Sequence, residues 1–188
     1  MVKLQSQRGA TLLEALVTLV IIAFGLLGLV GLQSRLQVSE MEAYQRSQAL
    51  ILLNDMANRI ATNRRVAGSY VTTTPLGTGN CPTTTGSRQQ ADAAEWCKAL
   101  EGAAETFGTG PGASKMGTVI GGRGCVEDLG NNEYLITVAW QGLVPISAPP
   151  DGVACGKDLY NGDTPTSPCK NDLCRRTVTT LVRIGSLT

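Results

Sequence analysis

The chain contains no histidine among its 188 residues. This absence excludes the Ser-His-Asp and Cys-His nucleophile systems and every metal site built on imidazole. Aromatic residues make up only 4% of the chain and charged residues 16%, and the formal net charge is +1. A chain with a net charge this small lacks the basic surface that is typical of nucleic-acid-binding proteins. We therefore expect no enzyme activity, no cofactor or metal site, and no nucleic acid among the partners.

Proline is also absent between Ala10 and Arg65, where the residue pattern predicts one continuous helix. Within it, Ala15–Leu32 is apolar except for Thr18, which is the length and composition of a membrane span. The second half, Gln33–Arg65, is amphipathic. The face that we expect to pack on a globular domain carries Leu36, Ala43, Leu50, Ala57 and Ile60.

The few glycines of this region bear on how the predicted helix packs and where it ends. Gly25, Gly28 and Gly31 recur at every third position, and small residues let membrane helices approach closely. We favour a tight packing face over the alternative, a segment that stretches or melts during assembly. Gly68 is the predicted end of the helix. Three basic residues of the last turns are expected to complement the helix dipole: Arg59, Arg64 and Arg65.

The segment in front of the apolar run is unusual. Met1–Gly9 is short, polar and basic, and the run begins five residues after Ala10 of a Gly9-Ala10 junction. Glu14 places a carboxylate inside the apolar segment, and a charge at the centre of a membrane helix costs roughly 2.5–3.5 kcal/mol. Ordinary secretory signals are cut after their apolar region, but no suitable site follows here. The alternatives are cleavage before the run, which leaves the helix on the mature protein, or an uncleaved signal anchor.

The arrangement Arg8-Gly9-Ala10-Thr11-Leu12-Leu13-Glu14 resembles the class III leader of type IV pilins. The resemblance implies cleavage by prepilin peptidase after Gly9, N-methylation of Ala10 and a glutamate as the fifth mature residue, which is Glu14. Cleavage would change the formal net charge from +1 to −1, because Lys3 and Arg8 leave with the leader. In a bundle of such subunits, the Glu14 carboxylate would meet the free α-amine of Ala10 on a neighbour and set its axial register. The alternative is a tolerated interfacial carboxylate with no partner.

All six cysteines follow the apolar run: Cys81, Cys97, Cys125, Cys155, Cys169 and Cys174. An even number without a Cys-x-x-Cys pair or histidine favours disulfides over zinc, and disulfides need an oxidising compartment. Lys3 and Arg8 in front of the span place the N-terminus in the cytoplasm and the rest in the periplasm.

The sequence leaves the cysteine pairing open among 15 connectivities. Our first choice is a Cys81–Cys97 bridge, which would close a turn-rich loop over Ser69–Gln90. Cys125–Cys174 and Cys155–Cys169 are the less secure pairs. The second of these pairs would pin a long loop, Pro145–Lys170. That loop carries three aspartates, which we read as solvated residues in preference to a calcium site: Asp151, Asp158 and Asp163.

The remaining pattern predicts one short helix and three strands. Asp92–Leu100 reads as a helix with Trp96 and Leu100 on one face. The strands are predicted at Lys115–Val126, Tyr134–Gly142 and Arg176–Ile184. A turn at Asn131-Asn132 joins the first two, and Arg175-Arg176 reads as a charge pair at a strand edge.

The resulting fold class is α+β: a long N-terminal transmembrane and amphipathic helix packed on a small antiparallel meander with cysteine-tethered loops, as in the type IV pilin fold. We expect a cleaved leader at 1–9, a transmembrane polymerisation segment at 10–32, an amphipathic helix half at 33–67 and a periplasmic disulfide-bonded domain at 68–188.

Three features of this domain are similar to the PilV-type minor pilins, the type IV pilus modification proteins. They are the Asp92-x-x-x-Trp96 helix, the strand with Val138-Ala139-Trp140 and the closing Cys174-Arg175-Arg176 strand. The resemblance implies a minor pilin of an initiation or tip complex, first in the inner membrane and then in the pilus. Its partners would be prepilin peptidase, other minor and major pilins, and a pilus tip protein. Two alternatives stay open: a minor pseudopilin of type II secretion, and an anchored periplasmic binding protein that never polymerises.

Overall fold

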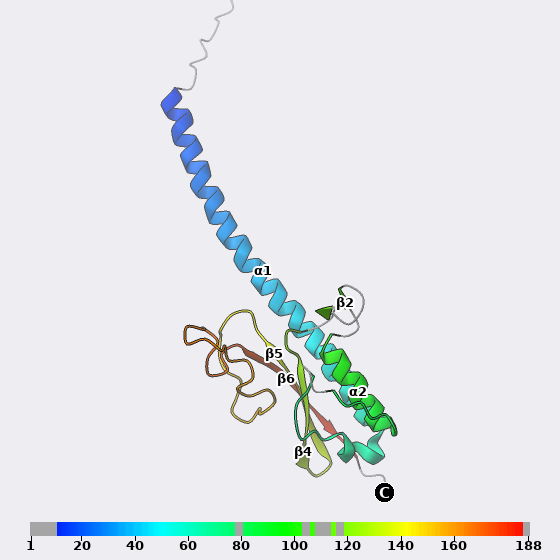
Figure 1. Cartoon of the computed structure of the whole chain (residues 1–188). Helices are drawn as coiled ribbons and strands as arrows, with labels where there is room; N and C mark the ends of the chain where they lie inside the picture. Colours follow the sequence, from blue (N-terminus) through cyan, green and yellow to red (C-terminus); the bar gives the residue numbers. More distant parts are fainter. Residues whose placement is uncertain (1–10, 78–80, 103–105, 108–113, 116–118, 186–188) are drawn as a thin grey trace, which may run out of the picture. The chain divides into compact units, whose positions relative to one another are not determined.

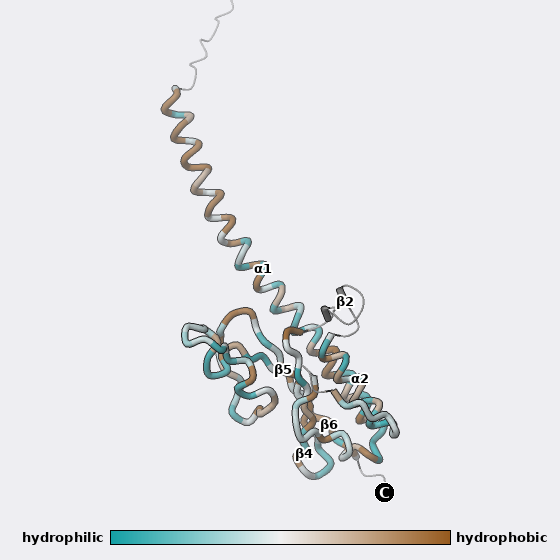
Figure 2. The backbone as a smooth tube through the Cα atoms, in the orientation of Figure 1, coloured by the Kyte–Doolittle hydropathy of each residue, from teal (hydrophilic) through white to brown (hydrophobic). Residues whose placement is uncertain are grey.

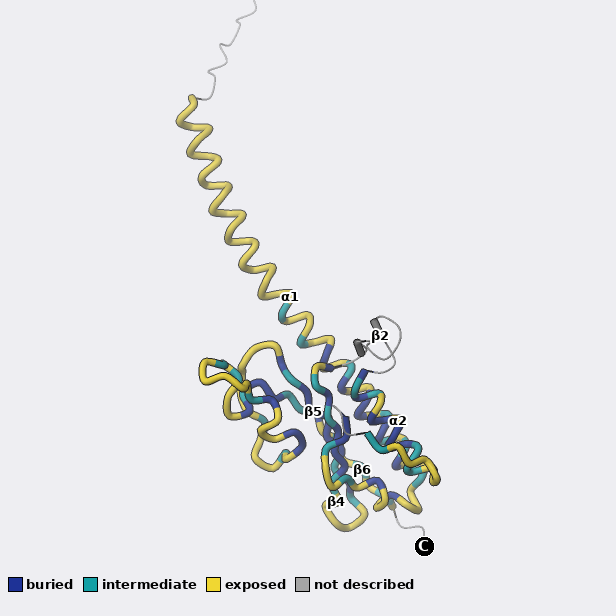
Figure 3. Tube along the Cα trace, in the orientation of Figure 1, coloured by how far each residue is buried: buried dark blue, intermediate teal, exposed yellow. Residues whose placement is uncertain are grey.

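The computed structural model describes residues 11–77, 81–102, 106–107, 114–115 and 119–185, and the chain divides into two compact units, 1–41 and 42–188. Helix α1, Leu12–Thr62, belongs to both units. In the first unit its surface is strongly apolar and exposed, as the colouring of Figures 2 and 3 shows. The continuous helix predicted up to Arg65 is confirmed from Leu12 onward, but it ends at Thr62. A 3₁₀ segment, η1 (Arg64–Tyr70), follows it and contains Gly68.

The second unit begins with the part of α1 that is packed. The buried face of the helix carries Gln45, Ala49, Leu52, Leu53, Met56 and Ile60. The predicted face was largely wrong, because Leu36 and Leu50 are 53% and 41% exposed. Positions spaced by seven drift around a straight helix, whereas the observed face follows steps of three and four residues. Only Ile60 of the predicted set is fully buried.

Helix α2, Arg88–Leu100, packs beside α1 (Figure 1). It begins four residues before the predicted start because Ser87 and Gln90 form a capping box. Trp96 and Leu100 are fully buried on one face, as predicted. The Trp96 indole donates a hydrogen bond of 2.9 Å to the Leu52 carbonyl of α1. Gly124 makes room for this ring, since a Cβ there would lie 2.1 Å from it.

A four-stranded antiparallel sheet has the order β1-β4-β5-β6. Its strands are β1 (Leu76–Gly77), β4 (Arg123–Gly130), β5 (Glu133–Gln141) and β6 (Arg175–Arg183). A separate pair consists of β2 (Thr106–Phe107) and β3 (Ser114–Lys115). The three predicted strands exist, but the bounds of the first were wrong. It was predicted at Lys115–Val126, whereas β4 begins at Arg123 and ends at Gly130. The turn at Gly121, where φ is +61°, precedes β4.

The β4–β5 hairpin has the predicted turn. Asn131 and Asn132 both have positive φ angles, 53° and 59°. Such angles are those of a type I′ turn, whose twist matches the flanking strands.

The main core lies between the helices and one face of the sheet (Figure 1). It is formed by residues such as Met56 of α1, Trp96 of α2 and Ile136 of β5. The loop between β5 and β6 closes a second, smaller cluster with Cys125, Ala139, Cys155 and Tyr160. The chain thus has a long N-terminal apolar helix whose second half packs on a small antiparallel sheet, with disulfides, consistent with a type IV pilin fold.

Candidate assembly site

The start of α1 is built around Thr11 and Glu14. The amide of Glu14 donates to the Thr11 hydroxyl at 3.3 Å, and the Ala15 amide donates to the Thr11 carbonyl at 3.1 Å. A carboxylate in the first turn is favoured by the helix dipole. Among the residues that the structure describes, the Glu14 side chain makes no ion pair. The site thus presents an exposed carboxylate at the start of an apolar helix.

Gly9 and Ala10, the predicted positions of cleavage and methylation, lie outside the described residues. Both assignments therefore remain predictions.

The apolar surface behind Glu14 has no cover within its unit. Its large side chains are 44–85% exposed between Leu12 and Leu32. The one polar residue of the run, Thr18, donates its hydroxyl to the Ala15 carbonyl at 2.8 Å, so it brings no unpaired donor into the apolar surface. In the described part of the chain, α1 is the helix that is long and apolar enough to cross a membrane. Such a surface needs lipid or other apolar helices around it.

The three disulfides are Cys81–Cys97, Cys125–Cys155 and Cys169–Cys174. The first pair is the one predicted. The other two predicted pairs were wrong. Cys125 lies on β4 and Cys174 directly precedes β6, and β5 separates these strands. Strands lie about 4.8 Å apart, so two strand spacings alone separate these positions by at least about 10 Å, beyond the reach of a disulfide.

A buried carboxylate joins the two helices. Asp92 of α2 is fully buried and accepts hydrogen bonds from Arg59 at 2.8 Å and from the Tyr70 hydroxyl at 2.6 Å. Asn63 donates to it at 3.2 Å, and Arg88 forms an ion pair with it at 3.1 Å. Four donors therefore converge on one carboxylate from α1, η1 and α2.

Arg59 is the centre of the charges around Asp92. It also bonds Asp55 at 3.0 Å and Glu95 at 2.7 Å. Burial by itself lowers the pKa of Arg59, but the hydrogen bonds to Glu95, Asp55 and Asp92 raise it overall. The pKa of Tyr70 is raised to about 12 by burial and by the neighbouring Asp92. Arg59 therefore ties α1 to α2, which the dipole interpretation missed.

Arg175 and Arg176 anchor the long loop between β5 and β6, and the prediction of a simple edge pair was wrong. Arg175 is buried, pairs with Asp172 at 3.1 Å and donates to the carbonyls of Val153 and Cys155.

Arg176 ties the same loop to α1. It donates to the Val144 carbonyl at 2.6 Å and pairs with Glu42 at 3.4 Å. Glu42 also accepts the Leu143 amide at 2.7 Å. The loop is therefore held by charge-assisted bonds at both of its ends.

The three loop aspartates do not converge. No group of three potential metal ligands occurs among the described residues. The backbone amide of Asp158 donates to the Asp172 carboxylate at 2.9 Å, an arrangement that shapes the loop.

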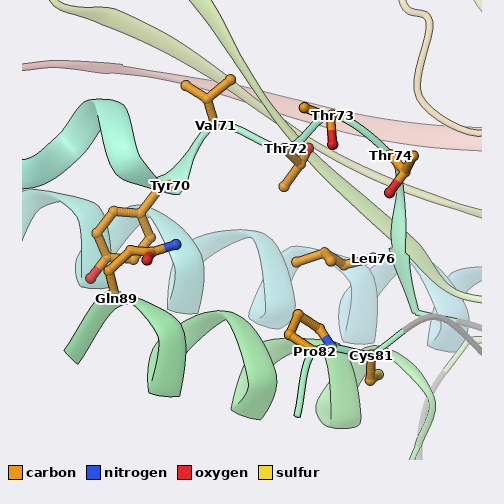
Figure 4. Close-up of a pocket in the computed structure, with 9 residues that line it drawn as sticks. All are labelled: Tyr70, Val71, Thr72, Thr73, Thr74, Leu76, Cys81, Pro82 and Gln89. Carbon is orange, nitrogen blue, oxygen red and sulfur yellow. The ribbon is translucent and has the colours of Figure 1, made fainter. Parts of the chain in front are cut away.

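A groove of about 320 Å³ lies between the segment after η1 and helix α2 (Figure 4). Thr73 and Thr74 are on one side, Pro82 and Gln89 on the other, and Leu76 lies between them. Its lining carries no carboxylate and no free thiol, since Cys81 is in a disulfide. The groove therefore offers neutral hydrogen-bonding groups but no acid–base pair for catalysis.

Comparison with known proteins bears on the N-terminal segment. Residues 4–30 match the prokaryotic N-terminal methylation motif. No curated protein and no solved structure matches the chain significantly. The motif spans Gly9, Ala10 and Glu14 and the apolar start of α1. Motif and fold together support a type IV pilin-like protein, a pilin or a pseudopilin, processed by prepilin peptidase and anchored by its N-terminal helix.

Proposed function

We propose that the chain is a PilV-type minor pilin that takes part in type IV pilus assembly. Prepilin peptidase would cut after Gly9, and Ala10 would be methylated. The observation that carries the proposal is the exposed Glu14 carboxylate at the head of an uncovered apolar helix within the methylation motif. A monomer in lipid gains nothing from such a charge, whereas a helical bundle can pair it.

In this proposal the subunit works without catalysis. Its helix joins the other minor and major pilins through 10–32, and its globular unit presents the specific surface of an initiation or tip complex. The disulfides and the loop anchors at Arg175 and Arg176 support this, because they keep the periplasmic surface in one arrangement. The N-terminus would lie in the cytoplasm and the globular unit first in the periplasm and then at the cell surface.

Deletion of the gene tests the proposal against the pseudopilin alternative, which the motif supports equally. We expect loss of surface pili and of twitching motility, with secretion of exoproteins unchanged and both pilus phenotypes restored by the wild-type gene in trans. Pili and twitching should be quantified by electron microscopy and agar stab assays, and secretion by activity in the culture supernatant. Loss of secretion with normal pili would show a pseudopilin and reject the minor-pilin assignment.

A further inference from the structure

Strand β6 forms a long edge of the sheet. It pairs with β5 over its whole length, from Gln141↔Arg175 to Glu133↔Arg183. In the part of the chain that the structure describes, no other segment pairs with its far side. The opposite side of the sheet differs, because β1 and Thr72 cover β4 there. As far as the described residues go, the sheet therefore has one paired edge, at β4, and one unpaired edge, at β6.

The register identifies the backbone groups on the uncovered side. The Gly142 amide donates to the Cys174 carbonyl at 2.7 Å, and the Ile184 amide donates to the Asn132 carbonyl at 2.9 Å. Both bonds lie on the β5 side, and the N–H and C=O groups of a strand alternate between its two sides. The even-numbered residues of β6 therefore face β5. The odd-numbered residues face away. The Arg175 amide already donates to the Asp172 carbonyl at 3.0 Å, so the groups available to a new strand belong to Thr177, Thr179, Leu181 and Arg183.

The middle of this edge lacks the usual protections of an exposed strand. Natural edge strands are kept from pairing by being short, by charged side chains, by proline, by bulges or by covering segments. The charges of β6, Arg175, Arg176 and Arg183, are at its two ends. β6 contains no proline or glycine, its register with β5 is continuous, and it is rich in β-branched residues. Thr179, Leu181 and Arg183 are exposed, whereas Thr137 beside them on β5 is fully buried.

We propose that β6 receives an extended segment of another subunit as a fifth strand of the sheet. The inference rests on the proposed function, because it places that partner in the pilin complex. The added strand would bond the backbone groups of Thr177, Thr179, Leu181 and Arg183, the mode of recognition called β-augmentation.

The neighbouring side chains define the chemistry of the partner. Val182 and Ile184 are only partly buried against the core, so the partner strand places an apolar residue beside them. The Arg183 side chain is 72% exposed, and Glu133 occupies one side of it at 2.6 Å. Its remaining donors fit a second carboxylate. The partner is therefore an alternating strand with an apolar inner face and an acidic residue opposite Arg183.

A second copy of the chain fits less well. Antiparallel pairing of two β6 edges about Thr179 would oppose Arg175 and Arg183 at both ends, and like charges opposite each other destabilise a sheet. The charge pattern therefore favours a different, acidic strand.

Amide hydrogen exchange at single-residue resolution tests the edge directly. The wild-type full chain is compared in the detergent-extracted membrane pool and in the assembled complex from the native host. The amides of Thr177, Thr179, Leu181 and Arg183 should exchange about ten-fold or more slowly in the complex. The amides of Val178, Thr180 and Val182 should be protected in both states.

Two negative results are distinguishable. An assembled chain whose odd-numbered amides exchange as in the membrane pool would overturn the edge and leave the assembly function intact. A chain found only as a membrane monomer would overturn both. Slowed exchange in complexes that contain this chain alone would identify a second copy and reject the acidic partner.

A backbone variant gives an independent test. Thr179→Pro removes an N–H that faces away from β5, so the β5–β6 ladder retains its bonds and the fold should persist. Thr179→Val is the matched control, because it changes the side chain and retains the N–H. We expect Thr179→Pro to fall at least about ten-fold in the assembled complex and Thr179→Val to remain. A folded Thr179→Pro chain at wild-type level in the complex would overturn the proposal; should it not fold, the exchange experiment on the wild type decides.

Discussion

Replacing Glu14 with alanine is expected to abolish assembly of the subunit while leaving it in the membrane. The variant makes the N-terminal run more apolar, so insertion is not impaired. In the proposed complex, however, it leaves the α-amine of Ala10 on a neighbour unpaired in an apolar environment. Breaking a buried ion pair in this way costs about 3–5 kcal/mol, which corresponds to a loss of incorporation of roughly a hundred-fold or more. The measurement is the amount of the chain in sheared pili relative to the inner membrane.

Glu40→Ala is the matched control for this experiment. Glu40 lies on the same helix and is exposed, but it is outside the apolar run and the methylation motif. It should assemble at the wild-type level, and Glu14→Gln should fail as Glu14→Ala does, because the amide carries no charge. Normal incorporation of Glu14→Ala would contradict the pairing role of Glu14, and absence of the wild-type chain itself from pili would favour a membrane-anchored protein that never polymerises.

Replacing Asp92 with alanine is expected to produce a large loss of stability in the globular unit. The substitution leaves Tyr70, Asn63 and Arg88 without their shared acceptor, and Arg59 loses one of three carboxylates. Removing one partner from a buried charged network costs about 3–5 kcal/mol, which for a domain of this size lowers the melting temperature by roughly 10 °C or more. Trp96 and Trp140 are both in the core of this unit, so tryptophan fluorescence of the full chain in detergent reports its unfolding.

The control is Glu95→Ala, which removes another carboxylate from the same arginine. Glu95 is 59% exposed, so solvent screens its pair with Arg59. Its loss should change the stability by about 0–1 kcal/mol. Equal effects of the two substitutions would contradict a dominant role for Asp92.

The elements of the fold could be predicted from local pattern, whereas their ends and contacts could not. The absence of proline and the apolar run predicted α1, and alternation predicted β5 and β6. The buried face of α1 depends on which side chains the sheet and α2 meet, and the long-range bond from Trp96 to Leu52 leaves no periodic signal. A strand of two residues such as β1 is likewise too short for any pattern.

The contacts around the functional segments likewise divide into those that local sequence indicates and those that depend on long-range packing. Glu14 could be found because a charge within an apolar run is conspicuous. Asp92 could have been suspected from its i,i+4 spacing to Arg88, and Arg59 from its i,i+4 spacing to Asp55. Their meeting across 33 residues depends on the packing of α2 on α1. The pairing of Cys125 with Cys155 required the order of the strands, because only that order shows that Cys174 is out of reach.

The most direct test of the account is the intact mass and N-terminal sequence of the mature protein from its native host. We predict a chain that begins at Ala10 and carries one added methyl group on its α-amine. The six cysteines should be fully oxidised, a state that lowers the mass by one hydrogen for each cysteine. A chain that begins at Met1, or one cut after Leu32, would contradict prepilin processing and leave Glu14 as an unexplained charge in a simple membrane anchor.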